Sequence, residues 1–381
     1  MNIFNKTISR RDFCRLAVVA VSGLSFVPVL ARKAVAGLTR EKGFVIKKEA
    51  RWYKRAGNGL VRCELCPNRC TLREGDRSNC LVREVENGIL NTLAYGNPAA
   101  VHVDPIEKKP LYHYFPGETT FSIATAGCNF TCLNCQNWQI SQMAPEETEN
   151  YKMLPEDVVK LARQNNCGII SYTYSEPSVF YEYMFDTAVI ARENGIKNTS
   201  ITNGFLNPLP LKELCSYLDA ANVDIKGFSD DFYMKFTDGR LQPVLDAIVI
   251  MKENGVHVEI TNLLLPGQND SDDMVSNLSK WIIKNTGPDT PLHFSRFTPM
   301  YKLKNLPPTP QKTLEKARKT AMDAGMYYVY IGNVHSPGVQ DTVCHNCGKT
   351  IINRTGYFIN SINMKNGCCA YCNAKIPGRW D

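Results

Sequence analysis

The decisive stretch of this sequence is Thr125-Ala-Gly-Cys-Asn-Phe-Thr-Cys-Leu-Asn-Cys-Gln-Asn-Trp138. Cys128, Cys132 and Cys135 stand in it with the spacing C-x₃-C-x₂-C. Three thiolates can hold three irons of a four-iron, four-sulfur cluster, and the fourth iron is then open to another ligand. A cluster that serves only electron transfer usually takes a fourth cysteine. The spacing therefore predicts a catalytic [4Fe–4S] site on these three residues.

The composition is that of a folded, slightly basic protein. The chain has 381 residues, of which 44% are hydrophobic, and a net charge of +7 from 44 basic and 37 acidic side chains. This length suits one large domain with appendages, or two domains. Because the charges are interspersed and no stripe of basic and aromatic residues occurs, we expect no binding of nucleic acid.

Residues 1–36 have the three parts of an export signal. The pair Arg10-Arg11 precedes an apolar run from Leu16 to Ala31, and Ala34-Val-Ala36 resembles a cleavage site. The paired arginines resemble a twin-arginine signal, which implies export of a folded protein that already carries its metal centres. We therefore expect a periplasmic or membrane-tethered protein. The alternative is that the signal is vestigial and the protein is cytoplasmic.

The remaining chain divides into three parts: a Cys-rich segment over 37–118, a regular region over 119–335 and a Cys-rich tail over 336–381. In the regular region, short β-rich runs alternate with amphipathic stretches of helical length, as in βαβ units with a parallel sheet. Strands are predicted at 121–125, 168–173, 197–202, 222–225, 257–263, 292–296 and 327–331, and helices at 155–165, 179–194, 209–220, 241–254, 272–286 and 313–324. About six such repeats predict an α/β fold with a partial (β/α)6-type, TIM-like barrel.

Polar residues follow or end several of the predicted strands. Glu176, Asn203 and Lys226 come after the second, third and fourth strands, and His293 lies in the sixth. Ligands of such barrels bind at the C-terminal ends of the strands, where the three cysteines also fall. These residues suit a ligand that carries an ammonium, a carboxylate and a ribose.

These motifs together resemble those of the radical S-adenosylmethionine superfamily, in the branch of the pyruvate formate-lyase-activating enzymes. The closer resemblance, over residues 60–381, is to the AmmeMemoRadiSam-system radical SAM enzymes. It rests on Asp104-Pro-Ile-Glu-Lys-Lys-Pro, Gly127-Cys-Asn, Cys135-Gln-Asn-Trp, Asn222-Val-Asp-Ile-Lys-Gly-Phe, Glu259-Ile-Thr, Pro291-Leu-His-Phe-Ser-Arg and Ile331-Gly-Asn-Val.

The resemblance implies a mechanism and a set of cofactors. One electron from the cluster cleaves S-adenosylmethionine, and the 5′-deoxyadenosyl radical takes a hydrogen atom from a substrate. It also implies a low-potential electron donor of the flavodoxin or ferredoxin type, and partner proteins of the same system. Glu176 matches the position that contacts the cofactor's ammonium, and Asn203, Lys226 and His293 match positions that contact its carboxylate or ribose. For Lys226 a substrate contact, and for His293 a structural role, are the alternatives. Asn134 stands where the family usually has an aromatic residue that meets the adenine.

Two further cysteine groups flank the barrel. In the tail, two C-x₂-C pairs about twenty residues apart predict a tetrahedral metal site, with zinc as the expected ion. A rubredoxin-like iron or disulfides are the alternatives. Before the barrel, four cysteines suit structural zinc or an auxiliary iron–sulfur cluster, between which the spacing does not decide. The tail ligands are Cys344, Cys347, Cys369 and Cys372, and the N-terminal ones are Cys63, Cys66, Cys70 and Cys80.

The function predicted is that of a radical SAM enzyme whose substrate the sequence does not name. Within it, activation of a glycyl-radical enzyme competes with modification of a small molecule or peptide. The Cys-rich tail favours the second, because activases usually need none. A non-catalytic iron–sulfur and zinc module for electron transfer is the alternative from another class.

Overall fold

The computed structural model describes residues 38–334 and 336–380, and its centre is one open, eight-stranded sheet. Seven strands run parallel, and β8 runs antiparallel to β9 at one edge. No pairing of β8 with β16 occurs in the described part of the chain, so the barrel is partial. In sheet order the strands are β16 (Val329–Gly332), β15 (Leu292–Arg296), β14 (His257–Leu264), β13 (Ala220–Asp224), β12 (Lys197–Thr202), β11 (Ile169–Tyr172), β9 (Thr119–Ala124) and β8 (Ala100–Pro105).

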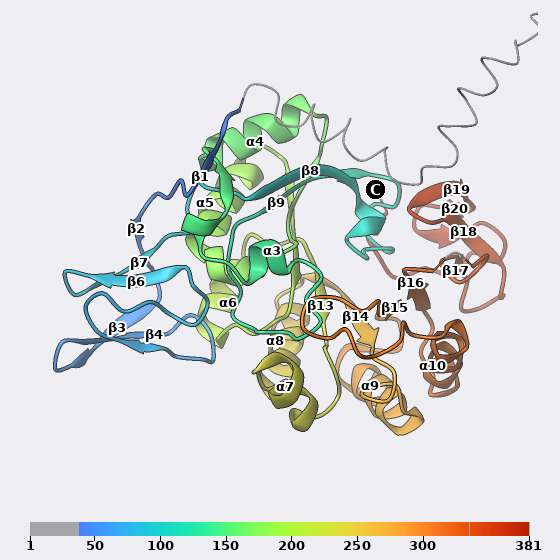
Figure 1. Ribbon diagram of the computed structural model, residues 1–381. Coiled ribbons are helices and arrows are strands. Elements are labelled where there is room, and N and C mark those ends of the chain that lie inside the picture. The colour runs from blue at the N-terminus through green and yellow to red at the C-terminus, as the bar shows by residue number, and fades with distance from the viewer. Residues whose placement is uncertain (1–37, 335, 381) are drawn as a thin grey trace, which may run out of the picture.

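Helices connect the parallel strands and cover the outside of the sheet (Figure 1). Their apolar faces are buried, for example Val158, Val159 and Ala162 of the first, as amphipathic crossover helices require. The connecting helices are α4 (Pro155–Gln164), α5 (Tyr181–Glu193), α6 (Pro208–Cys215), α8 (Leu241–Glu253), α9 (Asp272–Thr286) and α10 (Gln311–Asp323). The predicted partial barrel is thereby confirmed.

Among the differences from the expectation, three concern the sheet and the helices of the barrel. The edge strand β8 lies outside the predicted set, because its short run mixes apolar and polar residues and ends in a proline. The helix α6 ends at Cys215 rather than at 220, since residues 220–224 are needed for β13. The short helix α7 (Asp230–Thr237) also lies outside the predicted set, and Ser229 caps it by accepting a hydrogen bond from the Phe232 backbone N–H at 3.2 Å.

Small antiparallel sheets stand on both sides of the barrel, and the two Cys-rich parts lie far apart in Figure 1. On the N-terminal side, β3 (Tyr53–Gly57), β4 (Leu60–Cys63) and β5 (Thr71–Leu72) form one sheet, and β2 (Lys48–Glu49), β7 (Ile89–Thr92) and β6 (Arg83–Glu86) form another. On the C-terminal side are β17 (Thr342–Val343), β18 (Thr350–Thr355), β19 (Phe358–Ile362), β20 (Met364–Lys365) and β21 (Cys368–Cys369). The strands β1 (Arg40–Lys42) and β10 (Glu149–Tyr151) pair with each other.

The predicted signal over 1–36 lies outside the described residues. Within the part of the chain that is described, no helix has the length and apolarity needed to cross a membrane.

The segment 110–115 crosses the N-terminal end of the barrel. Glu259 of β14 fixes it, because its carboxylate accepts the backbone N–H groups of Tyr112 at 3.0 Å and His113 at 2.7 Å. Asn222 of β13 donates to the Pro110 carbonyl at 2.7 Å. This end of the barrel is therefore filled by protein, and the opposite end carries the cysteine loop.

Candidate active site

The three cysteines lie in the loop between β9 and the short helix α3 (Trp138–Ser141). Its first turn needs Gly127, whose φ is +93° and whose added Cβ would lie 2.5 Å from the Cys80 carbonyl oxygen. Backbone bonds from Thr131 to the Thr237 carbonyl and from Leu133 to the Phe236 carbonyl tie the loop to the end of α7. The β9 strand, α7 and the N-terminal segment thus hold the loop in place.

The thiols of this loop are only partly accessible. Burial raises the pKa of Cys128 well above its usual value, and the Glu176 charge adds to the shift. Burial also raises the pKa of Cys132, to about 11, although the nearby Lys226 opposes it. These thiols are therefore neutral by themselves and become thiolates when they bind a cation. Three converging soft donors fit the three-iron side of a [4Fe–4S] cluster.

Glu176 and Asn203 lie beside the first cysteine, at the ends of β11 and β12. The Glu176 carboxylate accepts three hydrogen bonds, from the Thr202 hydroxyl at 2.6 Å, the Asn203 backbone N–H at 2.7 Å and the Ser178 backbone N–H at 3.0 Å. The Asn203 amide lies 4.0 Å from the Cys128 sulfur. Burial raises the pKa of Glu176. The structure therefore places these two predicted residues next to the cysteine loop.

Lys226 lies beside the second cysteine, just beyond the end of β13. Its ammonium pairs with Asp224 at 2.7 Å. Burial lowers the pKa of Lys226, but the charge of Asp224 and its hydrogen bond to the ammonium outweigh that effect and hold the pKa above its usual value. Lys226 therefore stays cationic, and it brings a positive charge to the site.

His293 is not brought to the cysteines by any contact among the described residues. It is the second residue of β15, and its Nε2 lies 2.6 Å from the Glu259 carboxylate at the filled end of the barrel. Its ring stacks on Tyr330 with centroids 5.0 Å apart and meets Tyr112 edge-on at 4.8 Å. These contacts fit the structural role that was the alternative, and cofactor binding by His293 stays a prediction.

Aromatic side chains lie next to the cysteine loop that carries Asn134, although Asn134 itself is not aromatic. The rings of Trp138 and Tyr301 stack next to the cysteine loop, with centroids 5.4 Å apart and planes 15° apart. Lys302 donates its backbone N–H to the Leu133 carbonyl at 3.0 Å, which fixes the Tyr301 segment against the loop. An aromatic surface is thus available near Asn134 from elsewhere in the chain.

A buried charge network next to the site was not identified from the sequence. Asp104 of β8 accepts hydrogen bonds from Lys109 at 2.7 Å, from Lys108 at 2.8 Å and from the Tyr174 hydroxyl. Burial lowers the pKa of Lys109 to about 8. Tyr174 has a φ of +64°, and its carbonyl accepts the Asn137 amide at 2.7 Å, which links the network to the cysteine loop. The signal available was the pair of lysines soon after Asp104-Pro.

The C-terminal cysteine group (Cys344, Cys347, Cys369 and Cys372) has the geometry of a mononuclear metal site. All four sulfurs lie within 4.8 Å of one another, with Cys344–Cys372 at 3.6 Å and Cys347–Cys369 at 3.7 Å. Tetrahedral bonds of about 2.3 Å would place sulfurs about 3.8 Å apart. The Asn346 amide leads in lowering the pKa of Cys372 to about 6, so this thiol is ready to bind a cation at neutral pH. A single ion fits here, and zinc as its identity stays a prediction.

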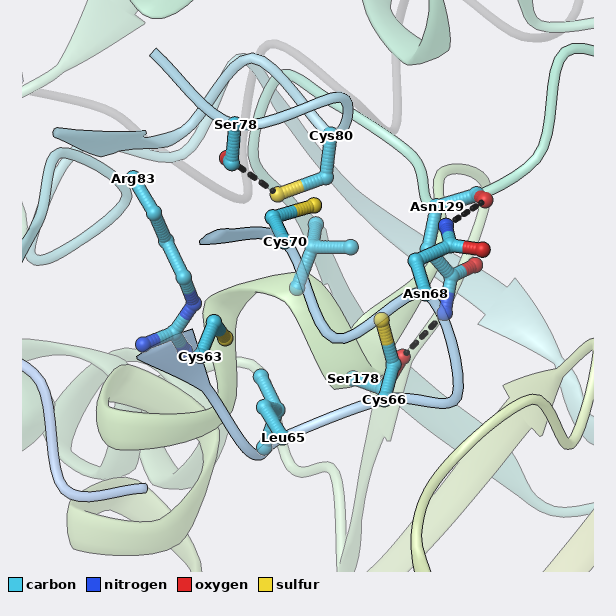
Figure 2. Close-up of a pocket in the computed structure, with 11 residues that line it drawn as sticks. Cys63, Leu65, Cys66, Asn68, Cys70, Ser78, Cys80, Arg83, Asn129 and Ser178 are labelled. Atoms are coloured by element: carbon cyan, nitrogen blue, oxygen red, sulfur yellow. Dashed lines mark hydrogen bonds between the residues drawn. The ribbon is translucent and has the colours of Figure 1, made fainter. Parts of the chain in front are cut away.

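The N-terminal cysteine group (Cys63, Cys66, Cys70 and Cys80) lines one pocket, drawn in Figure 2. Arg83, Asn129 and Ser178 line the same pocket. Asn129 directly follows the first cysteine of the barrel loop, so the two cysteine groups are neighbours.

A parallel barrel with three cysteines after its first strand, and acidic, amide and cationic groups beside them, defines a radical SAM enzyme. Residues 122–278 match the Radical SAM superfamily. An uncharacterized protein of Methanocaldococcus jannaschii is 46% identical over 331 residues, which cover 86% of this chain and 98% of that protein. The chain belongs to the radical SAM superfamily.

Two solved structures illustrate the likeness. A radical SAM methyltransferase from Sphaerobacter thermophilus has a TM-score of 0.48 at 14% identity, covering 78% of each chain. A domain of a pyruvate-formate lyase-activating enzyme from Bacteroides vulgatus has a TM-score of 0.39 at 14% identity, covering 43% of this chain and 98% of that one.

Proposed function

We propose that this enzyme reductively cleaves S-adenosylmethionine at a [4Fe–4S] cluster held by Cys128, Cys132 and Cys135. The observation that carries the proposal is the convergence of the strand ends on the cysteine loop. Glu176 and Asn203 lie beside its first cysteine and Lys226 beside its second. This arrangement supports a ligand with an ammonium and a carboxylate next to the cluster.

Each of these side chains suits a different group of the ligand, according to its charge. The Glu176 carboxylate offers about four lone-pair sites, and three are used by the chain, which leaves one for an ammonium. The Lys226 ammonium fits the carboxylate of the same ligand, and the Asn203 amide fits a neutral polar group. Glu176 and Asn203 are buried, which strengthens their interactions because water is excluded, whereas Lys226 is partly exposed. When bound, the cluster would supply one electron to the sulfonium and so release a radical that takes a hydrogen atom from the substrate.

The reaction requires an electron source, and we propose a low-potential, one-electron donor of the flavodoxin or ferredoxin type. For the substrate we propose a small molecule or a peptide that is modified together with partner proteins of the same system, with activation of a glycyl-radical enzyme as the alternative.

The test is made on the full chain, purified without oxygen and loaded with iron and sulfide. With dithionite and S-adenosylmethionine we expect 5′-deoxyadenosine to form, and the cluster's EPR spectrum to change when the cofactor is added. The Cys132→Ser variant should lose both. Cys215→Ala, which alters a lone buried cysteine on the outer helix α6, should keep both. A fully loaded protein that neither forms 5′-deoxyadenosine nor changes its spectrum would exclude the proposal.

A further inference from the structure

We propose that the N-terminal cysteine group holds a second iron–sulfur cluster, which passes electrons to the cluster of the barrel loop. The assignment of a second cluster goes beyond the proposed function. The electron transfer between the clusters rests on the proposed function.

The four thiols are grouped by the fold into a site shielded from solvent. Cys63 ends β4, Cys66 and Cys70 follow in the turn before β5, and Cys80 comes from the loop before β6. Cys63 and Cys80 are buried, Cys66 and Cys70 are partly buried, and all four line one pocket. Thiols that face a common pocket become thiolates when they bind a metal, and thiolates are ligands of both zinc and iron–sulfur clusters.

The spacing of the sulfurs separates these two possibilities. Among the described residues, the C-terminal cysteine group alone has its sulfurs all within 4.8 Å of one another. Neither the barrel loop nor the N-terminal cysteine group forms such a single-ion set. A single tetrahedral ion needs sulfurs about 3.8 Å apart. In a cluster each thiolate binds a different iron, so its sulfurs stand farther apart. The N-terminal cysteine group therefore resembles the barrel loop, and it differs from the mononuclear site of the tail.

An unpaired donor supports a negatively charged occupant. Arg83 is 1% exposed, and its two terminal nitrogens bond to the buried Glu182 at 2.8 and 3.2 Å. Its Nε has no partner among the described residues, and the guanidinium lies beside Cys63 in Figure 2. Buried N–H donors are rarely left unpaired. A cluster bound by four thiolates is anionic and offers sulfur acceptors. The Ser78 hydroxyl lies at hydrogen-bond distance, 3.1 Å, from the Cys80 sulfur, and hydrogen bonds to cluster sulfurs tune cluster potentials.

The second cluster would lie directly against the barrel loop. The Asn68 amide donates to the Asn129 carbonyl at 3.0 Å, which joins the turn of the N-terminal cysteine group to the residue after Cys128. The Cys80 carbonyl packs so closely on Gly127 that a Cβ there would lie 2.5 Å away. These contacts make a short path from one cysteine group to the other.

The electron transfer balances as two one-electron steps. A low-potential, one-electron donor is oxidised, and the N-terminal cluster is reduced. The N-terminal cluster then returns to its oxidised state as it gives that electron to the cluster of the barrel loop. No bond forms or breaks at the N-terminal cysteine group.

The metal assignment is tested on the variant Cys128→Ser/Cys132→Ser/Cys135→Ser, loaded with iron and sulfide without oxygen. We expect it to keep about four irons and four sulfides per chain. After reduction it should show an EPR signal that S-adenosylmethionine does not change. Acid-labile sulfide is the decisive readout, because a zinc ion or a single iron contains none. A protein without sulfide, with one zinc ion or no metal at these cysteines, would overturn the proposal.

The electron transfer is tested in the wild-type protein. Oxidised protein is mixed with one equivalent of reduced flavodoxin and frozen at successive times. The signal already assigned in the triple variant should rise first and then fall as the second signal rises. If the barrel-loop cluster is reduced first, the proposed direction of electron transfer is contradicted, whereas the assignment of a second cluster stands. A normal transfer that gives no 5′-deoxyadenosine after S-adenosylmethionine is added would instead contradict the proposed function.

Discussion

The substitution Asp104→Asn tests whether the charge network beside the site is sealed from water. Asp104 forms ion pairs with two lysines that differ in exposure. The Lys109 side chain is 1% exposed, and the Lys108 side chain is 34% exposed. Removing one partner of a buried ion pair costs about 3–5 kcal/mol, because the other charge remains buried. A half-exposed pair is worth at most about 1 kcal/mol. Lys108→Met is therefore the matched control, and it should cost little.

Two losses make up the expected magnitude. Without Asp104 the buried Lys109 ammonium can lose its proton, and one pKa unit corresponds to about 1.36 kcal/mol. Starting from the pKa of about 8 that Lys109 has in the folded wild-type protein, release of the proton at pH 7 costs about 1.4 kcal/mol. The weakened hydrogen bonds of Lys108 and Tyr174 to this carboxylate add about 1.5–3 kcal/mol. We therefore expect Asp104→Asn to lower the free energy of unfolding at pH 7 by about 3–5 kcal/mol.

The pH dependence has a definite sign. In the wild-type protein burial leads in lowering the pKa of Lys109 to about 8, so below pH 8 the folded and unfolded chains both bind this proton. In the variant the folded chain lacks it and the unfolded chain holds it, so the variant gains stability as the pH rises. The difference between the two proteins should shrink by about 1.4 kcal/mol per unit up to pH 8 and then level off.

Urea unfolding between pH 6.5 and 9.5, followed by circular dichroism, measures these differences. The double variant Asp104→Asn/Lys109→Met should recover most of the stability, because no unpaired charge is left. A cost below about 1 kcal/mol, or one that does not change with pH, would show that water reaches Lys109 and would refute the reasoning.

Three further outcomes are expected. Gly127→Ala should lower the free energy of unfolding by at least about 2 kcal/mol, because Gly127 has a positive φ and lies very close to the N-terminal segment. The control Gly255→Ala, at a positive φ in open space, should lower it by only about 1 kcal/mol. Equal losses of stability in thermal unfolding would contradict this expectation. Cys372→Ser should remove the single metal ion of the tail, while Cys368→Ser should keep it, as metal analysis would show. His293→Gln should lower stability but leave the affinity for S-adenosylmethionine within about twofold by calorimetry, and a tenfold loss would instead favour the cofactor role.

The barrel was predictable because its strands carry a strong and local signal. A buried parallel strand reads as a short apolar or β-branched run, as in residues 329–332, and the helices between strands have period 3.6. The edge strand β8 mixes apolar and polar residues and has a weaker signal. It pairs on one side only, and the Tyr174 hydroxyl that binds its Asp104 comes from a distant part of the chain. The network around Asp104 could not be predicted without that pairing.

The candidate site was predictable where a residue lies at the very end of a strand. Asn203 follows β12 directly and Lys226 stands two residues after β13, and the ends of parallel strands meet at one edge of the sheet. His293 was grouped with them because it lies in a strand. It is, however, the second of the five residues of β15, and a side chain there is directed to the filled end of the barrel. Position along the strand, and not membership of it, decides which side chains reach the site.

The three cysteine groups show what sequence spacing does and does not determine. In the tail, each C-x₂-C pair sits on a tight turn, closed by the bonds from Gly348 to the Cys344 carbonyl and from Asn373 to the Cys369 carbonyl. Two such turns facing each other bring four sulfurs together for one ion. Before the barrel, Cys63 and Cys66 have the same C-x₂-C spacing, but the fourth thiol, Cys80, arrives on a separate loop. The spacing therefore predicts which cysteines act together. The arrangement of the loops that carry them decides how far apart their sulfurs stand, and so whether one ion or a cluster fits between them.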